Sequence, residues 1–315
     1  MERMSSLDDA RQKPENLPLV FRLFRRLVRG VAGRGWGLHR IAPLSRIYGV
    51  VSSTLIPEGV VLVEIDEQNM YIKADGSEIA NSMITIGAWE KLETNLFLSL
   101  LKPDMTVVDV GANVGYYALL AAKRVAQVYA FEPDPDSFDL LTRSVQANGY
   151  TNVKCLRAAV TDKGGRSTFY IDSEAWGNSL CSNNVSKPVK TLDVETVCLD
   201  QLYAKGSLGE RIHLVKIDVQ GAEEMVLKGS ANVLARCRPI VLMEVEPRRL
   251  RNMGTDPYQL LKHLETDFGY TIRAIEGDGQ SLPLGDIISL AERMGTINVV
   301  ATALFVEPYT ATKLS

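Results

Sequence analysis

The sequence lacks the features that mark membrane-spanning, secreted and metal-binding proteins. No apolar run in its 315 residues approaches the ~20 residues needed to cross a bilayer. Residues 1–16 are polar and no long apolar segment follows them, so the N-terminus does not resemble a secretory signal. The four cysteines have no C-x-x-C spacing, and the three histidines are scattered along the chain. The sequence therefore does not support a histidine-based metal site, and we expect no bound metal. Reduced thiols in a cytoplasmic protein are the simplest expectation.

The composition is that of an ordinary folded protein, with 46% hydrophobic and 23% charged residues and neither internal repeats nor low-complexity segments. The chain is long enough for one large domain with an appendage. Its net charge of −3 is unevenly placed, because residues 17–48 contain seven arginines and no acid, which leaves a charge of about −10 on the remainder. An acidic body argues against nucleic acid as a partner.

The arginine-rich segment has the periodicity of an amphipathic helix over residues 20–31. Its predicted apolar face consists of Val20, Leu23, Phe24, Leu27, Val28 and Val31. The arginines at positions 22, 25, 26 and 29 fall on the opposite face, and Gly35-Trp36-Gly37 predicts a loop after the helix. Such a helix suits an anionic membrane interface. It equally suits packing on the domain or on a second subunit, with the arginines in water, so both interpretations stay open.

The rest of the chain predicts an α/β fold. We expect three segments: a basic extension at 1–48, a β-hairpin and helix at 49–100, and a core domain at 101–315. The hairpin strands are predicted at 60–65 and 70–73 and the helix at 90–102. The regular alternation of strands and helices that follows implies a mostly parallel sheet with helices on both faces. Its strands are predicted at 106–110, 127–132, 153–159, 213–219, 239–245, 270–275 and 296–305. Its helices are predicted at 115–124, 136–148, 222–235 and 256–268.

The most informative stretch is the turn after the first core strand, where the pattern reads Asp109-x-Gly111-x-Asn113-x-Gly115. A dinucleotide fingerprint needs G-x-G-x-x-G, and here the last glycine comes one residue early. Without a Cβ, Gly111 would let the backbone approach a ligand and Gly115 would let the next helix pack close to the strand. Glu132 ends the following strand, where it would accept hydrogen bonds from both ribose hydroxyls of a nucleoside. The alternative is an ordinary βαβ turn with a solvated glutamate.

Ligands in open α/β sheets bind beyond the carboxyl ends of the strands. Five acidic residues end predicted strands and can face one crevice: Asp109, Glu132, Asp218, Glu244 and Glu246. His213 begins its strand, so we expect it at the other edge of the sheet in a structural role.

Several motifs together resemble the FkbM-type family of class I S-adenosylmethionine-dependent methyltransferases. They lie, in order, at 109–117, 131–133, 199–202, 216–223 and 243–247, and the resemblance covers residues 84–245. Residues 89–94 are similar to the family's aromatic-Glu-Pro element, with Lys91 in place of the proline. The resemblance implies a Rossmann-like, mostly parallel seven-stranded sheet that closes on an antiparallel strand. It also implies transfer of a methyl group from S-adenosylmethionine to a hydroxyl of a sugar, glycolipid or secondary metabolite. A non-catalytic S-adenosylmethionine-binding partner subunit and an N-methyltransferase stay open.

The resemblance and the strand ends together nominate the residues that would bind the cofactor: Glu90, Thr94, Asp109, Gly111, Ala112, Asn113, Gly115, Glu132, Pro133, Ala158, Ala159 and Asp218. By resemblance alone, Glu90 and Thr94 would reach the methionyl ammonium and carboxylate. Ala158 and Ala159 would end the third core strand and offer adenine a flat surface and backbone N–H groups.

We expect Asp218 to lie nearest the methyl group and the acceptor, with Glu244 as the second candidate for the general base. Lys216 shares a strand face with Asp218 and would weaken its basicity by pairing with it. Asp218 can instead cap the helix that starts near Ala222. Trp176–Ser179 suggests either a lid over the site or a surface turn. The expected partner is a small-molecule, carbohydrate or lipid-linked acceptor rather than nucleic acid; peripheral contact with the inner face of a membrane and a homo-oligomer remain open.

Overall fold

The computed structural model describes residues 18–32, 54–173, 175–276 and 282–303. Two compact units contain them. One holds the described residues as far as Trp89 together with Gln146–Asn148, and the other holds Glu90–Val145 and the described residues from Gly149 onward. The loop predicted at 35–37, the side chain of Val31, most of segment 1–48 and the end of the strand predicted at 296–305 lie outside the described residues.

The first unit contains α1 (Leu19–Ala32), the antiparallel hairpin of β1 (Gly59–Ile65) and β2 (Gln68–Ala74), and α3 (Glu78–Thr85). The hairpin confirms the two strands predicted here. Its turn consists of Asp66 and Glu67, whose φ angles of 49° and 61° are both left-handed. Two such residues match the right-handed twist of the flanking strands, which is why the hairpin closes with so short a connection.

Helix α1 is confirmed, but its predicted apolar face is only partly the buried one. Of the described side chains of that face, only Val28 is buried, whereas Val20, Leu23 and Leu27 are exposed. The buried Phe21 was not part of the prediction, and the arginines at 25 and 29, predicted on the outer face, are half-buried and hydrogen-bonded to the Glu64 carbonyl. Tertiary packing therefore buries one side of the helix and leaves most of the predicted apolar face exposed to solvent. Sequence periodicity alone does not decide which side is buried.

The second unit is built on a seven-stranded sheet in the order β11-β12-β10-β9-β3-β4-β5. In chain order its strands are β3 (Thr106–Val110), β4 (Gln127–Phe131), β5 (Val153–Leu156), β9 (Leu214–Ile217), β10 (Ile240–Val245), β11 (Tyr270–Ala274) and β12 (Ile297–Ala303). The first five are parallel, and β12 runs antiparallel to both of its neighbours. The predicted mostly parallel, seven-stranded Rossmann-like fold is therefore confirmed.

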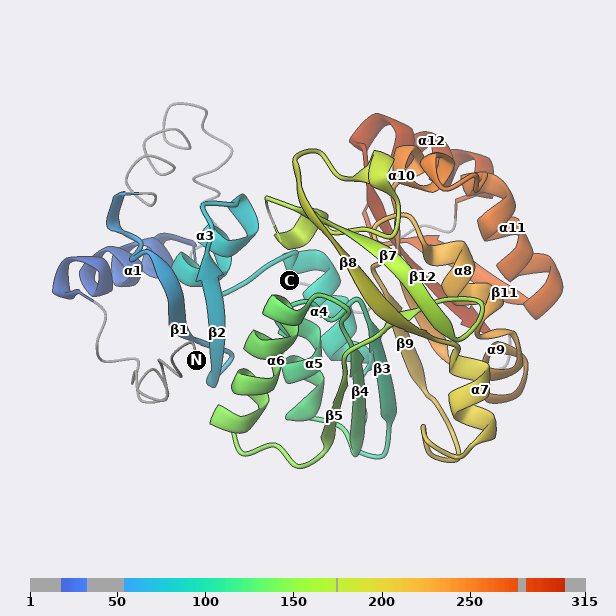
Figure 1. Cartoon of the computed structure of the whole chain (residues 1–315), viewed down its shortest axis with the longest axis horizontal. Coiled ribbons are helices and arrows are strands. Elements are labelled where there is room, and N and C mark those ends of the chain that lie inside the picture. Colours follow the sequence, from blue (N-terminus) through green and yellow to red (C-terminus); the bar gives the residue numbers. More distant parts are fainter. Residues whose placement is uncertain (1–17, 33–53, 174, 277–281, 304–315) are drawn as a thin grey trace, which may run out of the picture. The chain divides into compact units, whose positions relative to one another are not determined.

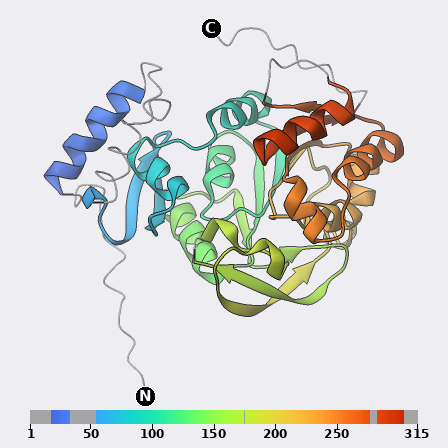
Figure 2. The same cartoon turned by 90° about the horizontal axis from the view of Figure 1, so that it is seen from above.

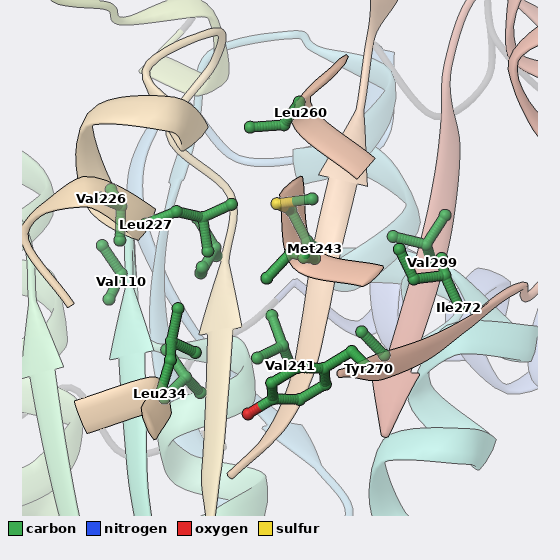
Figure 3. Close-up of a cluster of buried hydrophobic side chains, with 14 of the residues drawn as sticks. Val110, Val226, Leu227, Leu234, Val241, Met243, Leu260, Tyr270, Ile272 and Val299 are labelled. Atoms are coloured by element: carbon green, nitrogen blue, oxygen red, sulfur yellow. The ribbon is translucent and has the colours of Figure 1, made fainter. Parts of the chain in front are cut away.

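Helices lie on both sides of this sheet (Figures 1 and 2). They are α4 (Lys91–Leu100), α5 (Tyr116–Ala122), α6 (Pro135–Ala147), α7 (Leu199–Ala204), α8 (Glu223–Lys228), α9 (Ala231–Cys237), α10 (Pro247–Asn252), α11 (Pro257–Phe268) and α12 (Leu284–Met294). One sheet face packs against helices through a continuous buried cluster (Figure 3) that includes Val110, Val226, Leu227, Leu234, Val241, Met243 and Leu260. Strand side chains alternate between faces, so Asp109 and Lys216 lie on the opposite face.

The fold departs from the prediction in several places. The strand predicted at 153–159 ends at Leu156, and Ala159–Val160 forms β6 of a second sheet, in the order β6-β8-β7. The other strands of that sheet, β7 (Gly165–Asp172) and β8 (Pro188–Val197), were not predicted, because many of their side chains are exposed and the apolar alternation is weak. The helix predicted at 222–235 breaks at Gly229, where a Cβ would lie 2.1 Å from the carbonyl oxygen of Thr161. Helices α3, α7, α10 and α12 were also missed.

Within the described part of the chain, none of the helices combines the length and the apolar character that crossing a bilayer requires.

Candidate active site

The centre of the candidate site is a buried lysine on the face of the sheet that α4 and α5 cover. Lys216 of β9 is the register partner of Asp109 of β3, and its side chain is only 4% exposed. Its Nζ lies 3.2 Å from Oδ2 of Asp218 and 4.0 Å from Oε1 of Glu93 on α4. It also lies 4.5 Å from the centroid of the Tyr117 ring on α5, within the range of a cation–π interaction. The pairing of Lys216 with Asp218 confirms the prediction.

Lys216 and Asp218 each stabilise the charged form of the other. Burial alone would lower the pKa of Lys216, but the carboxylates of Asp218 and Glu93 outweigh it and raise that pKa. Burial would likewise raise the pKa of Asp218, yet the Lys216 ammonium and the Gln220 side chain hold it below its ordinary value. Lys216 is therefore a cation and Asp218 an anion at neutral pH.

Two other carboxyl groups beside Lys216 are incompletely satisfied. Among the described residues, both oxygens of Asp109 and one oxygen of Glu93 are buried without a hydrogen bond of good geometry, although the backbone of Ala118 and the side chain of Glu90 influence their pKa values. Burial raises the pKa of Asp109 to about 6 and that of Glu93 well above its ordinary value. Buried carboxyl oxygens without partners are costly unless a ligand supplies the donors. This part of the site therefore suits a cationic, hydrogen-donating group.

Gln220 joins the two candidate bases. Its Nε2 donates hydrogen bonds to Oδ1 of Asp218 at 2.7 Å and to Oε2 of Glu244 at 3.0 Å. Burial and the neighbouring Asp218 carboxylate raise the pKa of Glu244 well above its ordinary value. The structure thus brings Asp218 and Glu244 together with their pKa values displaced in opposite directions, that of Asp218 below its ordinary value and that of Glu244 above it.

The alternative role for Asp218, as the cap of the next helix, is not observed. Helix α8 follows Ala222 without a side-chain cap, and Oε1 of Glu223 accepts the N–H groups of Val219 and Gly221 instead. The Asp218 side chain faces Lys216 and Gln220, so its carboxylate is available to the site.

Sequence reasoning missed Gln220 and its supports. Its φ of 56° is left-handed, a conformation that no sequence pattern here indicates for glutamine. Ser179 Oγ and Asn184 Nδ2 both donate to the Gln220 carbonyl at 2.9 Å, and Asn184 also donates to the carbonyl of Arg249. Ser179, in the segment predicted as a lid or a surface turn, is fully buried. The segment between β7 and β8 therefore fixes the backbone that carries the Gln220 amide.

The turn after β3 is tied to the acid that ends β4. Asn113 and Asp134 donate their backbone N–H groups to the two carboxylate oxygens of Glu132, each at 2.8 Å. Gly111 and Ala112 donate theirs to the carbonyl of Phe131. Burial raises the pKa of Glu132 to about 8 in spite of the two N–H donors. Each oxygen still has a lone pair for a hydroxyl, as the predicted ribose contact requires.

The structure gives each of the two glycines a steric reason in addition to the predicted one. Gly111 has a φ of 82°, and a Cβ there would lie 1.9 Å from the carbonyl oxygen of Asp218. Gly115 has a φ of 93°, and its Cβ would lie 2.5 Å from Cδ1 of Leu141 on α6. The lack of a side chain at Gly111 therefore lets the turn after β3 lie against the strand end that carries Asp218. The lack of one at Gly115 makes room for α6.

The remaining residues nominated for cofactor binding lie at the start of α4, after β4 and around β6. Glu90 and Thr94 lie at the start of α4, where Glu90 Oε2 accepts from the Tyr117 hydroxyl and Thr94 donates to the Tyr116 hydroxyl, both at 3.3 Å. Pro133 follows Glu132 and is half-buried. The placement of Ala158 and Ala159 at the end of a main-sheet strand was wrong. Ala159 belongs to β6, and the N–H of Ala158 is already donated to the carbonyl of Leu156.

Comparison with known proteins gives a consistent result. The family model described as the methyltransferase FkbM domain matches residues 109–272, more than half of the chain. The hexuronic acid methyltransferase AglP of Haloferax volcanii is 32% identical over 170 residues, which cover 54% of this chain and just under two thirds (65%) of AglP. The 2-O-methyltransferase NoeI of Sinorhizobium fredii is 27% identical over 210 residues, covering 60% of this chain and 83% of NoeI. The crystal structure of the FkbM methyltransferase from Methylobacillus flagellatus KT is 11% identical, with a TM-score of 0.40 over 70% of this chain and 52% of that one.

S-adenosylmethionine is the cofactor of FkbM methyltransferases, and the residues of this site fit it. Glu132 has lone pairs left for the two ribose hydroxyls. The unpartnered oxygens of Asp109 and Glu93 are acceptors of the kind that the methionyl ammonium needs. The surplus of carboxyl groups around Lys216 also suits a ligand that carries a sulfonium as well as an ammonium.

Proposed function

Because the chain belongs to the FkbM methyltransferase family, we propose that it methylates a hydroxyl group of a carbohydrate acceptor, free or lipid-linked. The names of two relatives support this choice, since one specifies a hexuronic acid and the other a 2-O position. The observation that carries the proposal is the ionised carboxylate of Asp218, held by Lys216 and Gln220 beside the Gly111 turn.

When bound, the cofactor supplies a methyl group that its sulfonium already activates for displacement. The chain then has two tasks: to align the acceptor oxygen and to take its proton. Asp218 is proposed to accept that proton, because its lowered pKa keeps it ionised, whereas burial and the Asp218 charge raise the pKa of Glu244. A positioned base contributes about 10²- to 10⁴-fold in rate, and alignment contributes several kcal/mol more.

The remaining groups are proposed to keep this arrangement in place. Lys216 holds the charge of Asp218, and Gln220 fixes the orientation of its carboxylate relative to Glu244. Glu244, whose pKa is raised, is proposed to hydrogen-bond a second oxygen of a polyol acceptor. A vicinal diol would then present one hydroxyl to Asp218 and the other to Glu244.

The test is a methyl-transfer assay with labelled S-adenosylmethionine on a panel of sugars, uronic acids and glycolipids. We expect a product in which carbon–proton correlation spectra connect the new methyl to oxygen. The Asp218→Asn variant should lose about 10²-fold or more in kcat while its affinity for S-adenosylmethionine changes little. A methyl group on nitrogen, or cofactor binding without turnover on every acceptor, would refute the proposed reaction.

A further inference from the structure

Helix α1 presents an apolar surface to solvent. Of the eight large hydrophobic side chains that are exposed among the described residues, four lie on this one helix. They are Leu19, Val20, Leu23 and Leu27, each between 57% and 68% exposed. The other four are on separate elements: α4, β8, α11 and α12. A concentration of this kind marks a surface that binds something.

The orientation of α1 is fixed by its inner face. Phe21 and Val28 are buried in the first unit. The guanidinium groups of Arg25 and Arg29 both donate hydrogen bonds to the carbonyl of Glu64, at 2.9 and 2.8 Å. Turning the leucines inward would break these contacts, so their exposure is a property of how α1 packs.

The charge around the leucines indicates the kind of partner. Arg22 and Arg26 are exposed beside Leu19 and Leu23, and the helix contains no acidic residue. Leucines bordered by arginines match a surface that is apolar underneath and anionic on top, which is the interface of an anionic bilayer. A second copy of the helix would instead oppose arginine to arginine.

We propose that α1 is a membrane-surface helix that docks on anionic phospholipid, with Leu19, Val20, Leu23 and Leu27 at the acyl boundary and Arg22 and Arg26 at the phosphates. Its 14 residues span about 21 Å, less than the roughly 30 Å of a bilayer core, so the helix lies in the plane of the interface. This inference is independent of the reaction proposed above, since every residue in it belongs to the first unit.

The test is flotation of the full-length protein with vesicles. We compare phosphatidylcholine vesicles with vesicles that also contain phosphatidylglycerol, at low and high salt. The wild type should float with the anionic vesicles at low salt and much less with the neutral ones. Leu23→Glu/Leu27→Glu should reduce the bound fraction at least fivefold. The matched control, Val189→Glu/Met294→Glu, removes two equally exposed apolar side chains from the other unit and should bind as the wild type does.

A second variant separates charge from apolar contact. Arg22→Gln/Arg26→Gln should abolish most of the preference for anionic vesicles, because the remaining arginines of the helix, Arg25 and Arg29, are held on the Glu64 carbonyl. Calorimetric titration with S-adenosylmethionine and circular dichroism verify that each variant is folded. Wild-type binding that is equal on neutral and anionic vesicles, or absent from both, overturns the proposal. Full binding of the leucine variant to anionic vesicles would also overturn it. So would a wild-type dimer in sedimentation that the leucine variant dissociates, if the wild type does not bind vesicles.

Discussion

The ammonium of Lys216 lies 3.2 Å from Oδ2 of Asp218, although both residues come from one strand end of a mostly apolar sheet. The cation is nearly inaccessible to solvent, whereas the Asp218 side chain is 31% exposed. A buried cation therefore stabilises the charge of a carboxylate that solvent and ligands can still reach.

Removal of this cation should change the pH dependence of catalysis. Because Lys216 lowers the pKa of Asp218, the Lys216→Met variant should raise that pKa and move the acidic limb of the kcat profile to higher pH. Because Lys216 also holds the Asp218 carboxylate in place through its hydrogen bond, we expect kcat above the acidic limb to fall about tenfold. The control is Lys228→Met, which removes an exposed lysine paired with Glu224. An unshifted acidic limb in the Lys216 variant would show that Lys216 does not set the charge of Asp218.

Gln220 should influence turnover more than cofactor binding. Its left-handed φ of 56° suits glycine, so Gln220→Gly removes the side-chain amide without straining the backbone. We expect roughly tenfold lower kcat, with the dissociation constant for S-adenosylmethionine and the melting temperature nearly unchanged, because Asp218 and Glu244 lose their shared donor. Kinetics and calorimetry measure the two effects separately. Equal losses in cofactor affinity and in kcat would contradict a role confined to the bases.

Glu132 should make the stability of the ligand-free protein depend on pH. Its pKa is about 8 when folded and 4.5 as an ordinary glutamate, so its protonated form favours folding. Its stabilising contribution is complete below pH 4.5 and is lost as the pH rises toward 8. The Glu132→Gln variant mimics the protonated form. Relative to the wild type, its free energy of unfolding should increase between pH 5 and 8.5, by at most about 5 kcal/mol at about 1.4 kcal/mol per pKa unit.

Urea unfolding at several pH values measures this difference, and a constant difference would contradict it. The same variant should bind S-adenosylmethionine about tenfold or more weakly, because an amide accepts fewer hydrogen bonds from ribose than a carboxylate does.

Gly111 and Gly254 provide a matched pair. Their φ angles are 82° and 80°, but a Cβ at Gly111 would meet the Asp218 carbonyl, whereas a Cβ at Gly254 would meet nothing within 4 Å. Gly254→Ala should therefore cost about 1–2 kcal/mol from backbone strain alone. Gly111→Ala should cost at least about 2 kcal/mol more and should also weaken cofactor binding. Similar losses of unfolding free energy in the two variants would mean that the close approach to Asp218 is unimportant.

Local sequence was sufficient for the parallel core. The strand–turn–helix at 106–122 and the acid at the end of β4 follow from apolar runs, glycines and a carboxylate at fixed spacing. The pairing of Lys216 with Asp218 also followed, since residues two apart on a strand share a face. Contacts between distant segments were harder to foresee. The left-handed backbone of Gln220 is held by hydrogen bonds from Ser179 and Asn184, which lie far away in the sequence. The requirement for glycine at 111 comes from the close approach of the Asp218 carbonyl.

The sequence by itself determined that this chain would form an α/β methyltransferase core with acids at its strand ends, because those features depend on short-range periodicity and spacing. Only the tertiary structure decided the directions in which the pKa values of the two acids move, since Lys216, which packs beneath α4 and α5, lowers that of Asp218 while burial raises that of Glu244. It also decided which edge of α1 faces solvent, because the amphipathic pattern is compatible with either edge and the contacts of Phe21, Val28 and Arg29 select one.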